Sequence, residues 1–295
     1  MLVAVALLPA ITIQAYNEFD LRRARQVEVQ DQALSLAKLA AAEQQQIVQG
    51  IRQVLIALSE LPAIKARDSQ ACNTYLAAMQ PRFPAFLTFI VTDLDGQPFC
   101  DSNSDRKPVN VAARAYFASV LKTGAFTVGE FSIGLSVPRK VIQFALPFYG
   151  DDGRMGGVII APLGLDWLAD YIAQKGAPAG AALAITDRNG MYLARYPDNG
   201  RFVGRKLPAG KDGKLGHGAT ADVVDLDGVE RIVGFSTLGA DSGGLVVSFG
   251  LDKTQAFTAI QNHTQRDVLL IVLSTSLVLV LTSLGARRFI HRPLG

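Results

Sequence analysis

Histidine and cysteine are scarce in this 295-residue sequence, which contains three histidines and two cysteines. His217, His263 and His291 are far apart, whereas a metal site needs clustered His, Cys or carboxylate ligands. There is no Gly-x-Ser-x-Gly motif of serine hydrolases. Segment 204–213, GRKLPAGKDG, is misspaced for a phosphate-binding loop, and Asp212 stands where Ser or Thr would bind magnesium. We therefore predict no catalytic residue, metal or cofactor in this chain, and its status as an enzyme stays open.

Charged residues are also few, and they are evenly spread. They make up 19% of the chain, the formal net charge is +3, and no run of lysines and arginines forms a basic stripe. A nucleic-acid-binding surface would need such a stripe, so we predict no nucleic-acid partner. The apolar fraction of 49% argues against a disordered chain and allows one large folded domain or two small ones.

Two apolar runs lie near the ends of the sequence. The run VLLIVLSTSLVLVLTSLG at 268–285 holds 18 residues without a charge, enough to nearly cross a hydrocarbon layer of about 30 Å. Arginines follow at once within 287–292, which places that end in the cytoplasm. We predict a transmembrane helix at 268–286 rather than a buried core helix. Residues 1–16 are interpreted as a membrane anchor whose start is either intact or clipped, and a signal peptide is the alternative.

Segment 17–60 predicts a long stalk helix. It is rich in Ala, Gln, Glu, Leu and Arg, contains no proline, and contains no glycine before Gly50. Its apolar residues recur on one face of a helix, at Ile47, Ile51, Val54, Leu55 and Leu58. This stripe packs either on the chain's own domain or on a partner chain.

Two distant segments repeat one pattern, FIVTDLDGQPFC at 89–100 and LAITDRNGMYLA at 183–194. Each has an apolar run, an Asp-Gly or Asn-Gly dipeptide and a second apolar run, which is a strong signal for a β-hairpin with a type I′ turn. Hairpins and closing strands then recur in the same order. We therefore predict an internal duplication with an α+β fold, in which five-stranded antiparallel units occupy 61–176 and 177–254.

Three segments carry a resemblance to a known family. They are ARAYFASVLKTGAFTVGEFSIG at 113–134, VIQFALPFYGDDGRMGGVIIAPLGLDWL at 141–168 and ARRFIHRPLG at 286–295. With the stalk and the repeated hairpins, they resemble double-Cache (dCache) sensors of bacterial histidine kinases and diguanylate cyclases. The resemblance implies two PAS-like units between flanking transmembrane helices. It also implies a connecting helix at 255–267 and the start of a HAMP-like linker at 287–295, before an output domain that these residues do not contain.

The resemblance implies a receptor in the bacterial inner membrane, in contact with lipid, with residues 17–266 periplasmic and the C-terminus cytoplasmic. A small molecule is expected to bind the first unit and to change the signal sent across the membrane, with a homodimer as the expected assembly. A histidine kinase is the first expectation for the whole protein and a diguanylate cyclase the second. This chain itself contains no phosphoacceptor histidine box, nucleotide-binding glycine box or cyclase signature. The alternative is a ligand-free structural domain or a sensor for a protein partner.

In the resembling family the first unit holds the ligand, and an Arg-x-aromatic-aromatic motif there matches Arg114, Tyr116 and Phe117. A guanidinium is a planar fork suited to a carboxylate, and aromatic rings supply an apolar wall. Arg139 and Gln143 are further candidate hydrogen-bond donors. Whether their side chains point towards the ligand depends on which face of the sheet each residue occupies. In the alternative interpretation the two aromatic residues belong to the core and Arg114 is solvated.

The sequence departs from the amino-acid-sensing members of that family at two positions. Val109 stands where they carry a tyrosine, and Pro162 stands where they carry the aspartate that binds the ligand's ammonium group. Without that carboxylate, an α-amino group has no partner there. The resemblance therefore implies a small carboxylate without an amine as the ligand.

The resemblance also implies a disulfide between Cys72 and Cys100, positions that related sensors often pair. The periplasm permits disulfides, and closing a loop of about 28 residues would stabilise the fold by roughly 3 kcal/mol. Two buried free thiols are the alternative, because free cysteine is among the most buried residue types.

Overall fold

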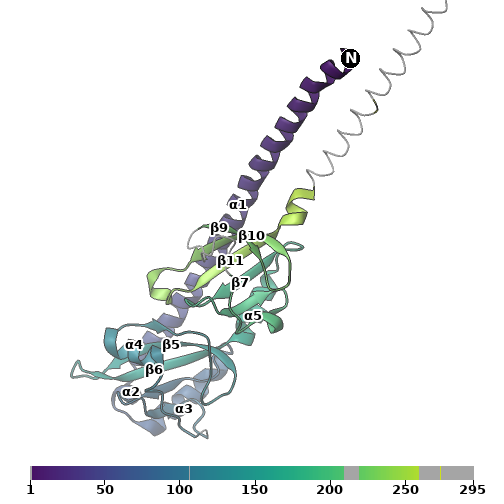
Figure 1. The fold of residues 1–295 in the computed structure, drawn as a ribbon. Helices are drawn as coiled ribbons and strands as arrows, with labels where there is room; N and C mark the ends of the chain where they lie inside the picture. The colour runs from purple at the N-terminus through teal and green to yellow at the C-terminus, as the bar shows by residue number, and fades with distance from the viewer. Residues whose placement is uncertain (1, 106, 209–218, 259–272, 274–295) are drawn as a thin grey trace, which may run out of the picture. The chain divides into compact units, whose positions relative to one another are not determined.

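The structure is a computed structural model that describes residues 2–105, 107–208 and 219–258, together with Leu273. Residues 30–252 form one compact unit that contains both β-sheets, and the described residues outside this range belong to a smaller unit. The architecture is α+β, with a long N-terminal helix and two antiparallel sheets (Figure 1). This confirms the predicted α+β class.

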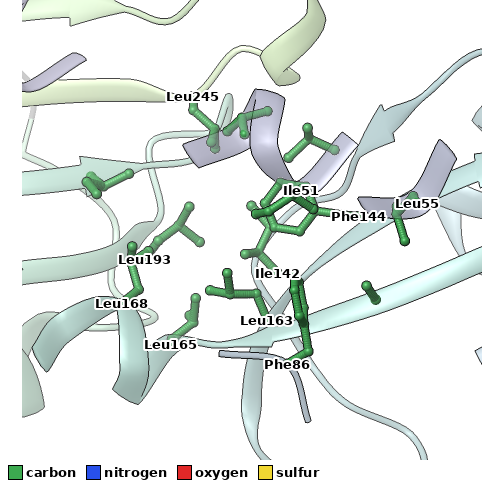
Figure 2. Packing of buried hydrophobic residues seen from close by; sticks show 14 of the residues in the cluster. Ile51, Leu55, Phe86, Ile142, Phe144, Leu163, Leu165, Leu168, Leu193 and Leu245 are labelled. Carbon is green, nitrogen blue, oxygen red and sulfur yellow. The ribbon is translucent and has the colours of Figure 1, made fainter. Parts of the chain in front are cut away.

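Helix α1 (Leu2–Ser59) is continuous over 58 residues, because helix formers dominate it and no proline follows Pro9 until the helix has ended. Its predicted apolar stripe packs inside the larger unit. Ile51 and Leu55 are 7% and 0% exposed, and they belong to a cluster that includes residues of both sheets (Figure 2). The stripe therefore stabilises α1 on its own domain, the first of the two alternatives.

Nearer the N-terminus, the buried face of α1 consists of small residues. Ala33, Ala37 and Ala41 are each at most 5% exposed. Here the helix approaches Gly234 of strand β10 (Glu230–Thr237), where an added Cβ atom would lie 2.5 Å from the carbonyl carbon of Ala33. Small side chains on both sides permit this distance, so α1 and the second sheet are in direct backbone contact.

The first sheet has six strands, where five were predicted. Its order is β2-β1-β6-β5-β3, and β4 also pairs with β5. The strands are β1 (Ile90–Thr92), β2 (Pro98–Asp101), β3 (Thr127–Val128), β4 (Ser132–Ile133), β5 (Lys140–Tyr149) and β6 (Met155–Gly164). The helices in this part of the chain are α2 (Pro62–Lys65), α3 (Ser69–Met79), η1 (Gln80–Arg82), α4 (Ala115–Thr123) and α5 (Leu165–Lys175).

The additional strand arises because segment 126–134 forms two short strands, β3 and β4, with an interruption between them. Gly129, Glu130 and Phe131 separate β3 from β4. The backbone N–H of Phe131 donates a hydrogen bond to Oδ2 of Asp187 at 3.0 Å. The bend is therefore held by a hairpin of the second sheet, a long-range contact that leaves no local pattern in the sequence.

The second sheet has five strands in the order β8-β7-β11-β10-β9, which repeats the order of the first sheet. Its other elements are β7 (Ala182–Thr186), β8 (Tyr192–Tyr196), α6 (Asn199–Phe202), β9 (Thr220–Val224), η2 (Ala240–Ser242) and β11 (Val246–Asp252). The matching strand order agrees with the duplication predicted from the repeated hairpins.

The repeated hairpins close with a different turn from the one predicted. In the first, the N–H of Gly96 donates to the Asp93 carbonyl at 3.3 Å, and the N–H of Asp93 donates to the Gln97 carbonyl at 3.0 Å. This is a type I turn followed by glycine in the left-handed region, with a φ of 75° at Gly96. Asp187 and Gly190 repeat the arrangement in the second hairpin. The type I′ prediction is wrong because an Asp-Gly or Asn-Gly dipeptide also fits this longer loop.

Cys72 of α3 and Cys100 of β2 form a disulfide, with Cα atoms 6.0 Å apart. Both residues are buried, at 1% and 2% exposure. The implied pairing is confirmed, and the bridge ties α3 to the edge strand of the first sheet.

Removal of this disulfide is expected to lower the free energy of unfolding by about 3 kcal/mol, because the unfolded chain regains the entropy of a long loop. Urea denaturation of a Cys72→Ala/Cys100→Ala variant beside the oxidised wild type measures the difference. Reduced wild-type protein should unfold at the midpoint of the double variant. Equal stability of oxidised and reduced protein would contradict the prediction.

No helix among the described residues is long and apolar enough to cross a membrane. The anchor predicted at 1–16 stays a prediction. The predicted span at 268–286 and linker at 287–295 lie outside the described residues, as does most of the connecting helix at 255–267.

A buried cluster of four charges lies on the second sheet. Nη2 of Arg195 lies 2.7 Å from Oδ2 of Asp225 and 2.8 Å from Oδ2 of Asp227. Nη1 of Arg231 lies 2.8 Å from Oδ1 of Asp227, and the Arg195 guanidinium stacks 3.8 Å from the Phe202 ring centroid. Burial would raise the pKa of the Asp227 carboxyl, but hydrogen bonds from Arg231, a backbone N–H and Arg195 hold this pKa well below its usual range. The cluster joins β8 and β10 to the turn that connects β9 and β10.

Candidate functional site

The start of α4 and strand β5 position the candidate ligand residues. Arg114 is the extended N-cap of α4, with φ −85° and ψ 133°, and Tyr116 follows in the first turn. On β5, Val141 and Gln143 line a cavity together with these two residues. Ala145 lies two residues further along β5 and therefore points to the same face of the sheet as Gln143. It packs in the apolar cluster that includes residues of α4. Gln143 therefore faces the α4 side of the sheet, away from α1.

The cavity is a partly open hollow, and the space of about 440 Å³ between its lining residues includes open solvent. Within the described part of the chain, Arg114 carries the only charge in its lining, and Thr88, Tyr116, Ser136 and Gln143 are its polar side chains. The rest of the lining is Leu87, Ile90, Val111, Gly134, Leu135, Val137, Val141, Ile160 and Pro162. A mostly apolar hollow with a few convergent polar groups is typical of a small-molecule site.

Arg114 keeps most of its hydrogen-bonding capacity available. Its Nη2 donates to the carbonyl oxygen of Ile133 at 3.1 Å, and the guanidinium has no other partner among the described residues. A guanidinium carries five N–H donors, so the remaining N–H groups of Arg114 can bind an anion in a bidentate way. Beside it, Gln143 is 5% exposed and donates from Nε2 to Oγ of Ser132 at 2.7 Å. The amide oxygen of Gln143 is left as an acceptor.

Tyr116 supplies a buried phenol to the same cavity. Burial raises the pKa of Tyr116 to about 12, although the positive charge of Arg114 opposes the shift. The phenol is therefore protonated at neutral pH and acts as a neutral hydrogen-bond donor. Its ring also packs with the apolar cluster between α4 and the first sheet.

A second, partly open cavity adjoins the first and shares Arg114, Tyr116 and Gln143 with it. Glu130 and Arg188 also line it, with Oε1 of Glu130 3.6 Å from Nε of Arg188. Arg188 belongs to the turn between β7 and β8, and its Nη2 donates to a β3 carbonyl oxygen at 2.8 Å. The second sheet thus contributes a residue to the surroundings of the candidate site.

The structure places the other two candidates elsewhere. Phe117 is 1% exposed and packs in the core between α4 and the first sheet. Arg139 pairs with Asp166, with 2.7 Å between Nη2 and Oδ2. Neither residue is among those that line the two cavities. A ligand role for them stays a prediction from the resemblance.

The sequence analysis missed Thr88 and the loop 134–137. Thr88 is 1% exposed, and its Oγ1 donates to Oδ1 of Asp101 at 2.5 Å. The loop carries Gly134, where a Cβ atom would collide with the carbonyl oxygen of Val137. That glycine is the available sequence signal for a tight turn here. It gives no indication that the turn closes over a cavity.

The three histidines lie outside the described residues. Within the described ranges, no group of three or more His, Cys, Asp or Glu side chains is arranged to hold a metal ion.

No protein-family model matches the sequence, and no curated protein matches it. Solved structures do resemble the chain. The extracellular domain of the putative histidine kinase rpHK1S-Z16 has a TM-score of 0.60 and 15% identity, with 80% of this chain and 98% of that chain covered. The ligand-binding domain of the Pseudomonas fluorescens chemoreceptor CtaA, in complex with L-isoleucine, has a TM-score of 0.65 and 20% identity, with 82% and 99% covered.

A third structure is the ligand-binding domain of the Pseudomonas aeruginosa chemoreceptor PctC, in complex with GABA. It has a TM-score of 0.58 and 17% identity, and 76% of this chain and 100% of that chain are covered. The chain therefore has the dCache-type fold of extracellular ligand-binding domains of histidine kinases and chemoreceptors. At these identities the likeness establishes the fold.

Proposed function

We propose that this chain is the extracytoplasmic sensing region of a membrane-bound signalling receptor, and that it binds a small carboxylate at Arg114. The observation that carries the proposal is the guanidinium of Arg114, the sole charge among the described residues that line the first cavity. Tyr116 and Gln143 lie beside it as a neutral donor and an amide. Residues of these types bind a carboxylate through the guanidinium fork and fix its orientation through neutral hydrogen bonds.

The lining of the first cavity supports a ligand without an amine. Pro162 lines it at the place where the amino-acid sensors of the family carry an aspartate. The carboxylate of Asp101, which is bound to the lining residue Thr88, already accepts hydrogen bonds from the Thr88 hydroxyl and the Asn103 N–H. An ammonium group in this cavity would therefore be desolvated without a counter-charge.

An amino-carboxylate is the second candidate, because Glu130 lines the adjoining cavity. CtaA and PctC bind ligands that carry both groups, L-isoleucine and GABA. For this chain the ligand would have to reach from Arg114 to Glu130 and replace part of the ion pair of Glu130 with Arg188. The carboxylate alone requires no such exchange, so it is the first choice.

The proposed signal is a shift between two conformations that bind the ligand with different affinity. The segment from β3 to β4 supports this, because its two ends contact different partners. The carbonyl oxygen of Ile133 accepts a hydrogen bond from Arg114, while the N–H of Phe131 donates to Asp187 on the second sheet. A ligand on Arg114 would alter a segment that the second sheet holds. We further propose that the receptor acts as a homodimer in the bacterial inner membrane and controls a cytoplasmic histidine kinase or, second, a diguanylate cyclase.

The proposal predicts that Arg114→Ala weakens carboxylate binding by about 10- to 100-fold, the loss expected for a charge-assisted bidentate contact. Thermal-shift screening of the purified full chain with small carboxylates, amino acids and amines would find the ligand, and calorimetry would measure its affinity. Arg154→Ala is the matched control, because that side chain is 89% exposed and does not line either cavity.

Each class of outcome has a clear meaning. Carboxylates that stabilise the wild type and fail on Arg114→Ala support the proposal. Stabilisation by amino acids, lost in a Glu130→Gln variant, supports the second candidate. If no compound of any class stabilises the chain, the ligand-free or protein-sensing alternative replaces both.

A further inference from the structure

The largest of the described cavities lies on the other sheet. It is a partly open hollow whose space of about 780 Å³ includes open solvent, and it is bounded by α1, the C-terminal end of α5 and the α1-facing side of the second sheet. Its apolar lining includes Leu36, Ala40, Leu183, Ile185, Val247 and Phe249. The four residues from the sheet are each at most 7% exposed, so the floor of the cavity is rigid core.

One polar side chain in this lining points to a ligand. Gln44 of α1 is 8% exposed, yet its amide has no hydrogen-bond partner in the part of the chain that the structure describes. The amide nitrogen and oxygen of Gln44 keep contact with solvent, because among the described residues they do not belong to the buried side-chain atoms that lack a partner. An amide that lines a cavity is available to whatever molecule occupies it.

Two charged side chains also line the cavity. Nζ of Lys175 lies 2.5 Å from Oε1 of Glu43, and the hydroxyl of Tyr171 donates to the same oxygen at 2.7 Å. The hydrogen bonds from Lys175 and Tyr171 lower the pKa of the Glu43 carboxyl, and the contact with Glu43 raises the pKa of Lys175. Both groups are therefore charged at neutral pH. An ammonium group carries three donors, and Glu43 uses one of those of Lys175.

We propose that this cavity binds an amphipathic carboxylate with a medium-length aliphatic chain. The chain would cover Leu183, Val247 and Phe249, and the carboxylate would accept hydrogen bonds from Lys175 and Gln44. A carboxylate is the first choice over an amine because Oε1 of Glu43 already accepts hydrogen bonds from Lys175 and Tyr171, whereas Lys175 keeps two N–H donors and Gln44 keeps its amide N–H groups. The site shares no lining residue with the Arg114 cavities. This proposal can therefore be tested independently of the function proposed for those cavities.

The chain contains a natural reporter for this site. Trp167, its single tryptophan, stacks on Tyr171 with ring centroids 5.5 Å apart, and Tyr171 contacts both Glu43 and Lys175. Octanoate added to the purified full chain is expected to change the tryptophan fluorescence in a saturable way and to raise the melting temperature. Octylamine and octanol are the charge-reversed and neutral probes, and both should bind more weakly than octanoate.

Three variants locate the binding. Lys175→Gln should weaken octanoate binding by about three- to tenfold, as for one partly exposed ion pair, and Gln44→Leu should weaken it at unchanged side-chain size. Ala40→Phe, which fills the cavity, should abolish it. Lys122→Gln, at an exposed lysine of α4, and Arg114→Ala should leave the tryptophan titration unchanged.

Several results would overturn the proposal. They are the absence of a saturable fluorescence change, a titration that Lys175→Gln and Gln44→Leu leave unaltered, and octylamine binding as tightly as octanoate. Sedimentation of Ala40→Phe adds a further check, because a changed oligomeric state would make this hollow a contact between copies of the chain. If Ala40→Phe fails to fold by circular dichroism, the two milder variants decide.

Discussion

Replacement of Gly234 by alanine is expected to destabilise the chain by about 4 kcal/mol, above the usual range for an overpacked core. The added Cβ atom would lie 2.5 Å from the backbone of Ala33 and Leu34. Backbone atoms of a packed helix cannot rotate away as a side chain can. Relief therefore requires that α1 move off the second sheet along the face formed by Ala33, Ala37 and Ala41.

Gly50→Ala is the matched control for this substitution. Gly50 lies in α1 and is exposed to solvent. A Cβ atom added there would have no other atom within 4 Å. Alanine there should stabilise the helix by about 1 kcal/mol, because glycine costs backbone entropy in a helix interior. Urea denaturation followed by circular dichroism compares both variants with the wild type. A Gly234→Ala variant within about 1 kcal/mol of the wild type would show that α1 shifts at little cost, contrary to the expectation.

The features that were predicted correctly rest on signals that are local in the sequence. The helical spacing of Ile51 and Leu55 identified the buried stripe of α1, and the repeated hairpins identified the two sheets. The bend at Gly129–Phe131 was missed because Asp187, which holds it, is distant in the sequence. A strand interrupted by such a contact looks continuous in a local pattern.

The candidate site shows the same limit. Arg114 and Tyr116 line the cavity as the resemblance implied, whereas Phe117 turns into the core because consecutive helical residues point in different directions. The face of the first sheet to which Gln143 points could be assigned only once the pairing of β5 was known. The location of Gln44 in a cavity lining could not be predicted from the sequence, because one more glutamine in a polar helix carries no structural signal. Its burial follows from the position of the second sheet, which helix periodicity does not reveal.

The two sheets share a strand order but differ on the face that points away from α1. On the first sheet that face carries the Arg114 cavity. On the second sheet it is covered by Tyr192, Phe202 and Phe235, next to the ion cluster of Arg195. Duplication of the scaffold therefore left the first copy hollow on this side and filled the second with side chains. This difference explains why the proposed second site lies on the opposite, α1-facing side of its sheet.

The ion cluster gives the second large prediction. Arg195→Met is expected to cost about 3–5 kcal/mol, because it leaves the carboxylates of Asp225 and Asp227 buried with one guanidinium between them. The Arg195 side chain is 0% exposed, so water cannot take its place without rearrangement. Arg139→Met is the control. Its ion pair with Asp166 is 51% and 64% exposed, so that substitution should cost less than about 1 kcal/mol.

The same cluster predicts an acid sensitivity with a definite sign. The pKa of Asp227 in the folded chain is lowered from its ordinary value of 3.8, so the unfolded state binds a proton more readily than the folded state. The stability that this carboxylate contributes is fully present above that ordinary value. It is lost as the pH falls below that value towards 2. Urea midpoints measured across this range should fall steeply for the wild type and less steeply for Asp227→Asn.

A double variant separates the loss of pairing from the loss of packing. In Arg195→Met/Asp227→Asn, one positive and one negative charge leave together, and the remaining pair of Arg231 with Asp225 is neutral overall. If the cost of Arg195→Met comes from an uncompensated buried charge, the double variant will be more stable than the single one. If the two costs simply add, the stacking of Arg195 on Phe202 carries the stability, and the electrostatic account of the cluster is wrong.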